Sequence, residues 1–483
     1  MKSKIIIGLD GFRALACLWV VVLHVWALYP QDTLDDEEKI LYSNISTSVP
    51  FNFVYNGSYG VDIFFILSGY LIMSILGKEL AHHYTSQLFL FGANKKRKQT
   101  STRQDPEKTA LLTNEIVPNF YQERTKELPT TIPPLYSLAF LKSSLKFYIR
   151  RIFRILPSYS ASLLIYYLLA SNIAYKYSRI EVRICDDKIW TNFLFIQNFY
   201  SFICMSWSWS IAVEMQMYLI SPLIVWLVLR FERFAHLTLI GFSLISMGSY
   251  IGLTYGHDAN ASEWMEYVYI RPYSRIFAYL IGMQVALVIA QQRLKAQRDI
   301  EDKEIEFREE EDQNQNFTTF QKVRDLLLRV LAILVFLFST IICSADPTQV
   351  DDPTLFALNI FFGRFFFTFV IAYMMYDSLS DQVWKEPLHK ISVWILSSHL
   401  LFWIAQVSYE MYLLHPTLLK NIYHGYKNIA DEISFSIWVY FVFLLLIIIA
   451  SFVFSCILYI LVGKPFLNLS DLIFRKTSNF WKN

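Results

Sequence analysis

The chain has 483 residues, of which 54% are hydrophobic and 17% are charged, and its formal net charge is +2. Soluble domains average about 45–50% apolar and about 25% charged residues, so this composition argues against an ordinary soluble enzyme. It excludes a disordered chain and a fibrous repeat, five cysteines are too few for a small disulfide scaffold, and the near-neutral charge gives no support for nucleic-acid binding.

Ten segments are apolar enough to cross a bilayer as helices, which takes about 20 residues each. They predict one all-α domain over residues 1–483, a polytopic membrane bundle of about ten helices. The apolar stretch 388–404 follows Pro387 and lies too close to the ninth span to cross the membrane alone. We expect it to be interfacial or re-entrant. The expected spans are 5–29, 58–77, 157–175, 209–229, 235–256, 272–290, 326–345, 355–377, 405–424 and 433–461.

The distribution of Lys and Arg orients the predicted bundle. Residues 78–154 carry 14 Lys and Arg, and residues 291–329 carry eight. The positive-inside rule places both segments in the cytosol, and an even number of spans places both termini there as well. Residues 92–132 are polar and contain proline, which predicts a flexible loop, whereas 291–325 alternate in charge and predict a charged cytosolic helix or loop.

Several residues on the predicted outer loops indicate the compartment. Asn44, Asn56 and Asn260 begin glycosylation sequons. Cys185 and Cys204 flank the loop before the fourth span, and either a disulfide or two free thiols would fit. These signals favour the secretory pathway or the plasma membrane, and an organellar inner membrane stays an alternative.

The first span carries ionisable residues that a hydrocarbon layer disfavours, which makes them functional candidates. Arg13 and His24 are 11 positions apart, so they share a helix face and lie about 16 Å apart along it. Asp10 is one turn before Arg13 and can pair with it. A charged cofactor bound at Arg13, with the His24 imidazole deeper in the membrane to remove a proton from an acceptor, suits group transfer. The alternative is a histidine that only forms a structural hydrogen bond between two helices.

The entrance of the third span reads FYIRRIFRILP. Arg150, Arg151 and Arg154 crowd one turn there. Three guanidinium groups can bind phosphates through charge-assisted hydrogen bonds. The alternative is positive-inside anchoring by side chains that reach the membrane surface.

Later spans add further polar candidates. Glu214 and Gln216 lie inside the fourth span, where an unpaired carboxylate is costly. The other candidates are Asp62 and Ser68 in the second span, Arg275 at the start of the sixth and His415 before Pro416 in the ninth. Ser68-Gly69 also permits close helix contact.

Six segments together resemble the acyltransferase-3 family of integral membrane acyltransferases, and most closely its nose-resistant-to-fluoxetine branch. They are LDGFRALACLWVVVLH, YGVDIFFILSGYLI, FYIRRIFRILP, WSWSIAVEMQMYLISPL, RPYSRIFAYLIGM and VSYEMYLLHP, in the family's order over residues 9–416. The resemblance implies about ten membrane helices, an acyl-CoA donor on the cytosolic side and an acceptor on the far side. The family's Arg–His motif falls on Arg13 and His24, and its RxxR element on Arg151 and Arg154.

The chain departs from the family pattern at three places. Met215 follows Glu214 where bacterial members usually have a second acid. Near the C-terminus the chain reads Gly463-Lys464-Pro465-Phe466, where many members have a glutamate before Pro-Phe. We also expect this chain to lack the extra luminal domain that members often carry. A partner protein could then handle the acceptor, or the acceptor is small or lipidic.

These observations lead to one hypothesis and two alternatives. We expect acyl transfer, of an acetyl group in the simplest case, from acyl-CoA to a hydroxyl of a glycan, lipid or small molecule, with no metal. His24 is expected to act as base, Arg13 and Glu214 to assist it, and the remaining polar candidates to bind substrate. The alternatives are a transporter or lipid-handling protein that uses the same polar cavity, and a non-catalytic subunit of a larger membrane complex.

Overall fold

The structure is a computed structural model, and it contains helices and no strand among the residues that it describes. Nine helices in these residues are long and apolar enough to cross a membrane, and a bent pair makes a tenth candidate. The expected all-α polytopic bundle is therefore confirmed. The described residues are 4–29, 34–83, 135, 137–172, 176–201, 203–256, 261–306, 319–343, 352–380, 387–427 and 436–477.

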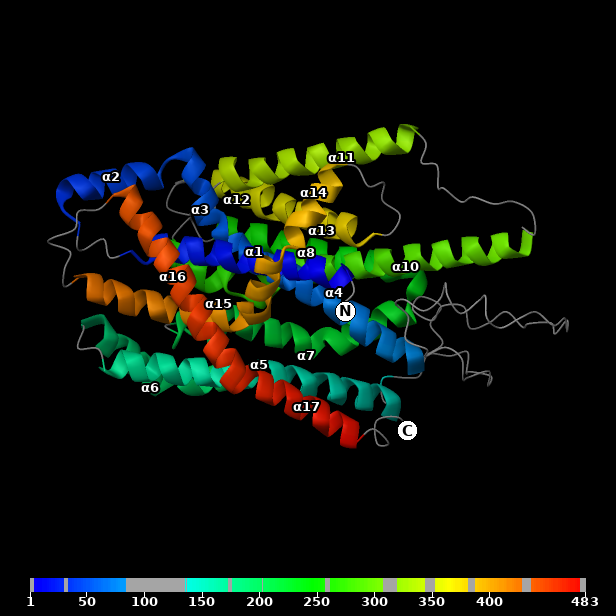
Figure 1. Cartoon of the computed structure of the whole chain (residues 1–483), viewed down its shortest axis with the longest axis horizontal. Coiled ribbons are helices and arrows are strands. Elements are labelled where there is room, and N and C mark those ends of the chain that lie inside the picture. Colours follow the sequence, from blue (N-terminus) through cyan, green and yellow to red (C-terminus); the bar gives the residue numbers. More distant parts are fainter. Residues whose placement is uncertain are drawn as a thin grey trace.

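The helices follow the predicted order along the chain. The long elements are α1 (Lys4–Ala27), α4 (Gly60–His83), α5 (Leu138–Asn172), α7 (Trp209–Arg230), α8 (Ala235–Gly256), α10 (Ile276–Glu306), α11 (Thr319–Leu337), α13 (Phe366–Leu379), α15 (His399–Lys427) and α16 (Ile437–Leu458). Shorter helices are α2 (Asp36–Ser46), α3 (Asn52–Tyr55), α6 (Lys176–Phe193), α9 (Ala261–Trp264), α12 (Pro353–Ile360), α14 (Pro387–Leu396) and α17 (Lys464–Lys476). Helix α1 lies inside the bundle and contacts α4, α13, α14, α15 and α16 (Figure 1).

Helices α4 and α10 cross at the closest approach in the bundle's core. A Cβ atom on Gly69 would lie 1.9 Å from the carbonyl oxygen of Tyr279, and one on Gly282 would lie 2.0 Å from that of Ile66. Two glycines facing each other's backbones therefore allow a contact that no larger residue permits. The predicted close helix contact at Ser68-Gly69 is present, and it fixes α4 beside the polar residues of the site.

Helix α5 begins well before the predicted third span. We expected this span to open at Pro157, but the helix starts at Leu138 and Pro157 lies inside it. Residues 138–156 form an amphipathic helix that packs along α17, where the rings of Phe153 and Phe466 lie 6.5 Å apart. The three arginines of the RxxR region therefore stand on a continuous helix and not on a loop before it.

Two other predicted boundaries are refined by breaks in helices. The stretch expected to be interfacial or re-entrant forms α14, which is bent by 53° from α15 across a short break. The eighth span is α12 and α13, joined by a π-helical turn at Phe361–Phe365. This turn widens the helix around Arg364.

The charged segment after the sixth span continues that helix. Helix α10 runs unbroken to Glu306, beyond the apolar part that ends at Lys295 (Figure 1). Helix α1 begins and α17 ends toward the same end of the bundle as the end of α10 (Figure 1). The predicted flexible loop at 92–132 lies outside the described residues, as do residues 307–318.

The connection between α6 and α7 contains a disulfide. Helix α6 ends in a turn, and Cys185 in α6 is bonded to Cys204 before α7. Of the three sequons, Asn44 is exposed on α2 and Asn260 lies outside the described residues. Asn56 is fully buried and donates hydrogen bonds to the carbonyls of Ser339, Thr340 and Cys343. Its burial contradicts the expectation that it carries a glycan.

Candidate functional site

Two histidines from distant parts of the chain meet in the bundle. Nδ1 of His24 on α1 lies 2.7 Å from Nε2 of His415 on α15. His415 is fully buried, and its Nδ1 lies 2.9 Å from the carbonyl oxygen of Met411. Two residues that the sequence marks as separate candidates therefore form one hydrogen-bonded unit, which ends at the carbonyl of Met411.

The carbonyl of Met411 determines the proton positions of this unit when both rings are neutral. A carbonyl only accepts, so Nδ1 of His415 carries the proton and its Nε2 is an acceptor. Nδ1 of His24 must then donate to His415, which leaves the lone pair of Nε2 of His24 unused among the described residues. These tautomers are assigned from the hydrogen-bond network. A half-buried imidazole with an unused Nε2 lone pair has the form required of a general base.

Arg13 lies on the same helix as His24, toward the end where the chain begins. Its Nη1 is 3.4 Å from Oδ1 of Asp10, and the Arg13 side chain keeps 20% of its surface exposed. Arg13 also interacts electrostatically with Glu214 and Arg154. The sequence prediction that Asp10 pairs with Arg13 is confirmed, and the guanidinium is left partly accessible.

Glu214 is held between α4 and α7. Its Oε1 accepts a hydrogen bond of 2.6 Å from the Ser68 hydroxyl and another from the Tyr218 hydroxyl. The ring of Tyr218 in turn faces Arg151, whose Cζ lies 4.8 Å from the ring centroid. Glu214 is half-buried and makes no hydrogen bond to His24 in the structure, so it does not orient the imidazole. That position is occupied by His415.

The three arginines of α5 separate in the structure. Arg151 is half-buried against Tyr218, while Arg150 is exposed and stacks at 4.7 Å over the ring of Phe474 on α17. Arg154 is also exposed, and it interacts electrostatically with Arg13. Arg13 therefore interacts electrostatically with both Glu214 and Arg154, Arg151 contacts the tyrosine that donates to Glu214, and Arg150 lies on the α17 side.

Asp62 and Arg275 do not join this site. Both are fully buried, with Nη1 of Arg275 3.3 Å from Oδ1 of Asp62. Oδ2 of Asp62 lies 2.7 Å from Nη1 of Arg364, a third fully buried residue. The rings of Tyr59 and Tyr269 lie 4.6 Å and 5.1 Å from Cζ of Arg364. Fully buried charges that bind one another have no surface left for a substrate, so the expectation of substrate binding by Asp62 and Arg275 is not supported.

Gln216 also has a structural role in the fold. It donates from Nε2 to the carbonyl of Phe195 at 2.7 Å and to Oδ1 of Asn198 at 2.8 Å. Because Gln216 is two residues from Glu214, the two side chains leave opposite faces of α7. Gln216 therefore fastens the connection between α6 and α7 and does not face the site.

Two residues near the site were not predicted from sequence. Tyr218 links Glu214 to Arg151, and its position four residues after Glu214 is a helical-neighbour signal that could have found it. Glu410 is a buried carboxylate within a quoted motif, VSYEMYLLHP, and its intramembrane position could have singled it out.

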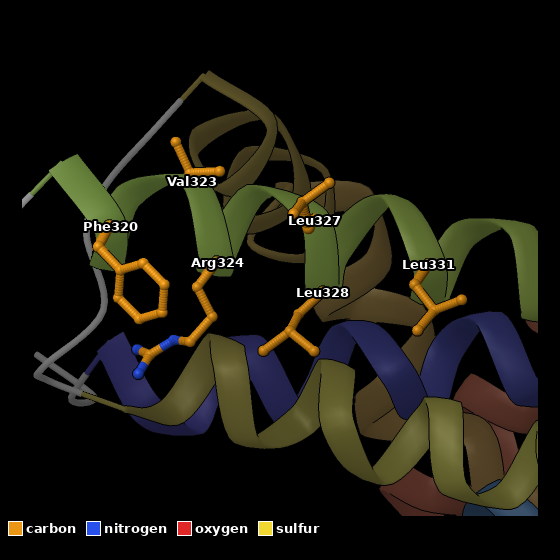
Figure 2. Close-up of a pocket in the computed structure, with 6 residues that line it drawn as sticks. All are labelled: Phe320, Val323, Arg324, Leu327, Leu328 and Leu331. Atoms are coloured by element: carbon orange, nitrogen blue, oxygen red, sulfur yellow. The ribbon is translucent and has the colours of Figure 1, made fainter.

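A surface pocket elsewhere on the molecule contains no such chemistry. Figure 2 shows it along one helix, α11, where apolar side chains surround a single charged one. The charged side chain is Arg324, whose Nη2 lies 2.7 Å from Oδ1 of Asp325. Within the described residues, no group of three or more His, Cys, Asp or Glu side chains is arranged to hold a metal ion. The pocket is lined by Phe320, Val323, Arg324, Leu327, Leu328 and Leu331.

Comparison with known proteins identifies the family. The model of the acyltransferase-3 family, described as an acyltransferase domain, matches residues 6–101 and 135–460. This chain belongs to the acyltransferase-3 family. Both histidines, the three arginines of the site and Glu214 lie within the matched residues, so the resemblance found in the sequence motifs is confirmed over most of the chain.

One curated relative is similar over part of the chain. It is "Nose resistant to fluoxetine protein 6" of Caenorhabditis elegans, with 26% identity over 204 residues. The match covers 38% of this chain and 25% of the relative, so the chain matches a quarter of that protein's length. No solved structure matches the chain.

Proposed function

We propose that this protein transfers an acyl group, an acetyl group in the simplest case, from acyl-CoA to a hydroxyl of a glycan, lipid or small molecule. Membership of a membrane acyltransferase family supports the reaction class. The observation that carries the proposal is the His24–His415–Met411 chain of hydrogen bonds. It leaves one imidazole nitrogen of a membrane-embedded histidine ready to accept a proton.

The chemistry assigned to His24 balances without a further reactant. Nε2 of His24 takes the proton of the acceptor hydroxyl while its oxygen attacks the thioester carbonyl carbon. The new C–O bond forms, the C–S bond breaks, and CoA leaves as a thiolate. The imidazolium then returns the proton to give the CoA thiol, so the site ends as it began. His415 supports this cycle because it keeps the His24 ring in one orientation and one tautomer.

The arginines supply the donor end of the proposed site. Arg151 and Arg154 would bind CoA phosphates by charge-assisted hydrogen bonds. Arg13, on the same helix as His24, interacts electrostatically with Arg154. Glu214 offsets part of this positive charge and, with Ser68, holds α4 against α7. The excess of Lys and Arg in residues 78–154 supports a cytosolic position for the donor.

The end of the bundle away from the arginines supports a proposal for the acceptor and the compartment. If the arginines face the cytosol, the Cys185–Cys204 disulfide lies on the other side of the membrane. Disulfides persist in oxidising compartments, so this bond favours a lumen or the cell exterior on that side. We place the protein in the secretory pathway or plasma membrane, with acceptors that are luminal, extracellular or within the bilayer.

A thiol-release assay on purified protein tests the proposal. Acetyl-CoA is supplied to the full chain in lipid nanodiscs, with and without pooled sugar and lipid alcohols, and free CoA thiol is measured. We expect acceptor-dependent thiol release that is lost in His24→Ala. The matched control is His236→Ala, because His236 pairs with Gln291 and Gln284 away from the site. Substrate flux in liposomes with neither thiol release nor CoA binding would instead establish a transporter.

A further inference from the structure

Glu410 is a buried carboxylate that the proposed reaction does not use. It lies on α15 with 4% of its surface exposed, and its Oε1 accepts a hydrogen bond of 2.9 Å from the Ser158 hydroxyl of α5. It forms no ion pair with a described residue. A carboxylate inside a membrane helix is costly, so its retention calls for a function.

The surroundings of Glu410 are shaped to hold its carboxylate. Gly463 ends the π-helical turn Tyr459–Gly463, and a Cβ atom there would lie 2.8 Å from Oε1 of Glu410 and 3.2 Å from the Ser158 hydroxyl. The missing side chain at 463 thus leaves the space that the carboxylate occupies. Three elements, α5, α15 and the end of α16, meet at this one acidic group.

The charge that Glu410 can influence is Arg154. Arg154 lies one turn before Ser158 on α5, so the two side chains share a helix face. Glu410 interacts electrostatically with Arg154, and Arg154 also interacts with Arg13. Two arginines repel each other, and a nearby carboxylate offsets that repulsion. Arg154 itself remains exposed and is therefore accessible to a ligand.

We infer that Glu410 is a positioning residue for the donor: its carboxylate keeps Arg154 beside Arg13, where the arginine binds the phosphate groups of acyl-CoA. This inference rests on the proposed function. It makes Glu410 a determinant of affinity for the nucleotide part of the donor. It assigns Glu410 no contact with the thioester and no proton in the reaction.

Two donors separate this role from a general structural one. Acetyl-CoA carries the nucleotide phosphates, and acetyl-pantetheine carries the same thioester without phosphate. Glu410→Gln keeps the side-chain volume and an oxygen for Ser158 but removes the charge. We expect it to raise KM for acetyl-CoA about fivefold, as expected for one lost charge interaction, with KM for acetyl-pantetheine and both kcat values unchanged.

A double-mutant cycle tests whether Glu410 acts through Arg154. In an Arg154→Ala background, Glu410→Gln should have no further effect on KM for acetyl-CoA. Gly463→Ala is the second variant, because its methyl group displaces the carboxylate while Glu410 itself stays. It should raise KM for acetyl-CoA alone. Ser162→Ala is the matched control, because the hydroxyl of Ser162 lies one turn further along α5 and has no hydrogen-bond partner among the described residues, and it should leave KM nearly unchanged.

The outcomes separate this inference from the function on which it rests. Equal effects of Glu410→Gln on both donors, additive effects with Arg154→Ala, or a fall in kcat with acetyl-pantetheine would overturn the inference alone. A wild-type protein that neither binds nor turns over acetyl-CoA would overturn the proposed function and the inference together. Thermal unfolding midpoints of each variant show that the comparison is made on folded protein.

Discussion

The bundle contains two groups of intramembrane charges that differ in how far their side chains are exposed. In the Asp62–Arg275–Arg364 cluster, all three side chains are fully buried and the carboxylate is shared by two guanidiniums. Around His24, Arg13 and Glu214, the side chains are partly exposed, and Nε2 of His24 has no partner among the described residues. An intramembrane charge can therefore belong to a structural joint or to a candidate reactive site, and the exposure of its side chain distinguishes the two.

Removal of the carboxylate from the Asp62–Arg275–Arg364 cluster should destabilise the fold. Asp62→Ala leaves two arginines buried without their counter-charge, and we expect it to lower the free energy of unfolding by about 3–5 kcal/mol. Thermal unfolding in detergent, followed by circular dichroism, measures the loss. Glu214→Ala is the matched truncation in the other group and should lower the midpoint much less, because Glu214 is only half-buried. Equal loss in both variants would show that the two groups do not differ in this way.

A substitution in the group around His24, Arg13 and Glu214 should lower the rate of acyl transfer and leave the fold intact. His24→Ala removes the proposed base, and we expect kcat to fall by about 10²–10⁴-fold, the usual contribution of a general base. The unfolding midpoint and CoA binding should stay near wild type. Thiol release with saturating acetyl-CoA measures the rate, and wild-type turnover in this variant would remove His24 from the mechanism.

His415 sharpens the comparison because it is fully buried and yet belongs to the reactive group. His415→Phe retains a buried ring but loses the acceptor for Nδ1 of His24, so the tautomer of His24 is no longer fixed. We expect kcat to fall about 10–100-fold, the range seen when a group that orients a metal-bound histidine is removed. His415→Gln, which can still accept a hydrogen bond, should recover part of the rate. No difference between the two variants would indicate a packing role only.

Arg151 should show the smallest of these effects. Arg151→Ala removes a charge-assisted contact to the donor phosphates, and we expect KM for acetyl-CoA to rise about tenfold. Arg150→Ala is the matched control, because Arg150 stacks on Phe474 and should change KM less. A larger effect at Arg150 than at Arg151 would place the phosphates on the α17 side of α5.

The positions of the spans were largely predictable because hydropathy is a local property. The largest difference is at α5: the apolar pattern predicts a span that begins at Pro157, whereas the helix already runs through residues 138–156. Proline is accepted inside a membrane helix when neighbouring helices satisfy the freed carbonyl groups. Amphipathic residues that pack on α17 lengthened the helix, and no window of about 20 apolar residues detects such a segment.

The sequence by itself determined that this is a polytopic helical protein of the acyltransferase-3 family and which few residues carry charge into the membrane. Only the tertiary structure decided how these residues are grouped. His24 and His415 are 391 positions apart, and Asp62 and Arg364 are 302 positions apart. A carboxylate in hydrocarbon must find a partner, but sequence spacing reveals only partners on the same helix. Packing between helices therefore assigned Asp62 to a structural joint and His24 to the candidate reactive site.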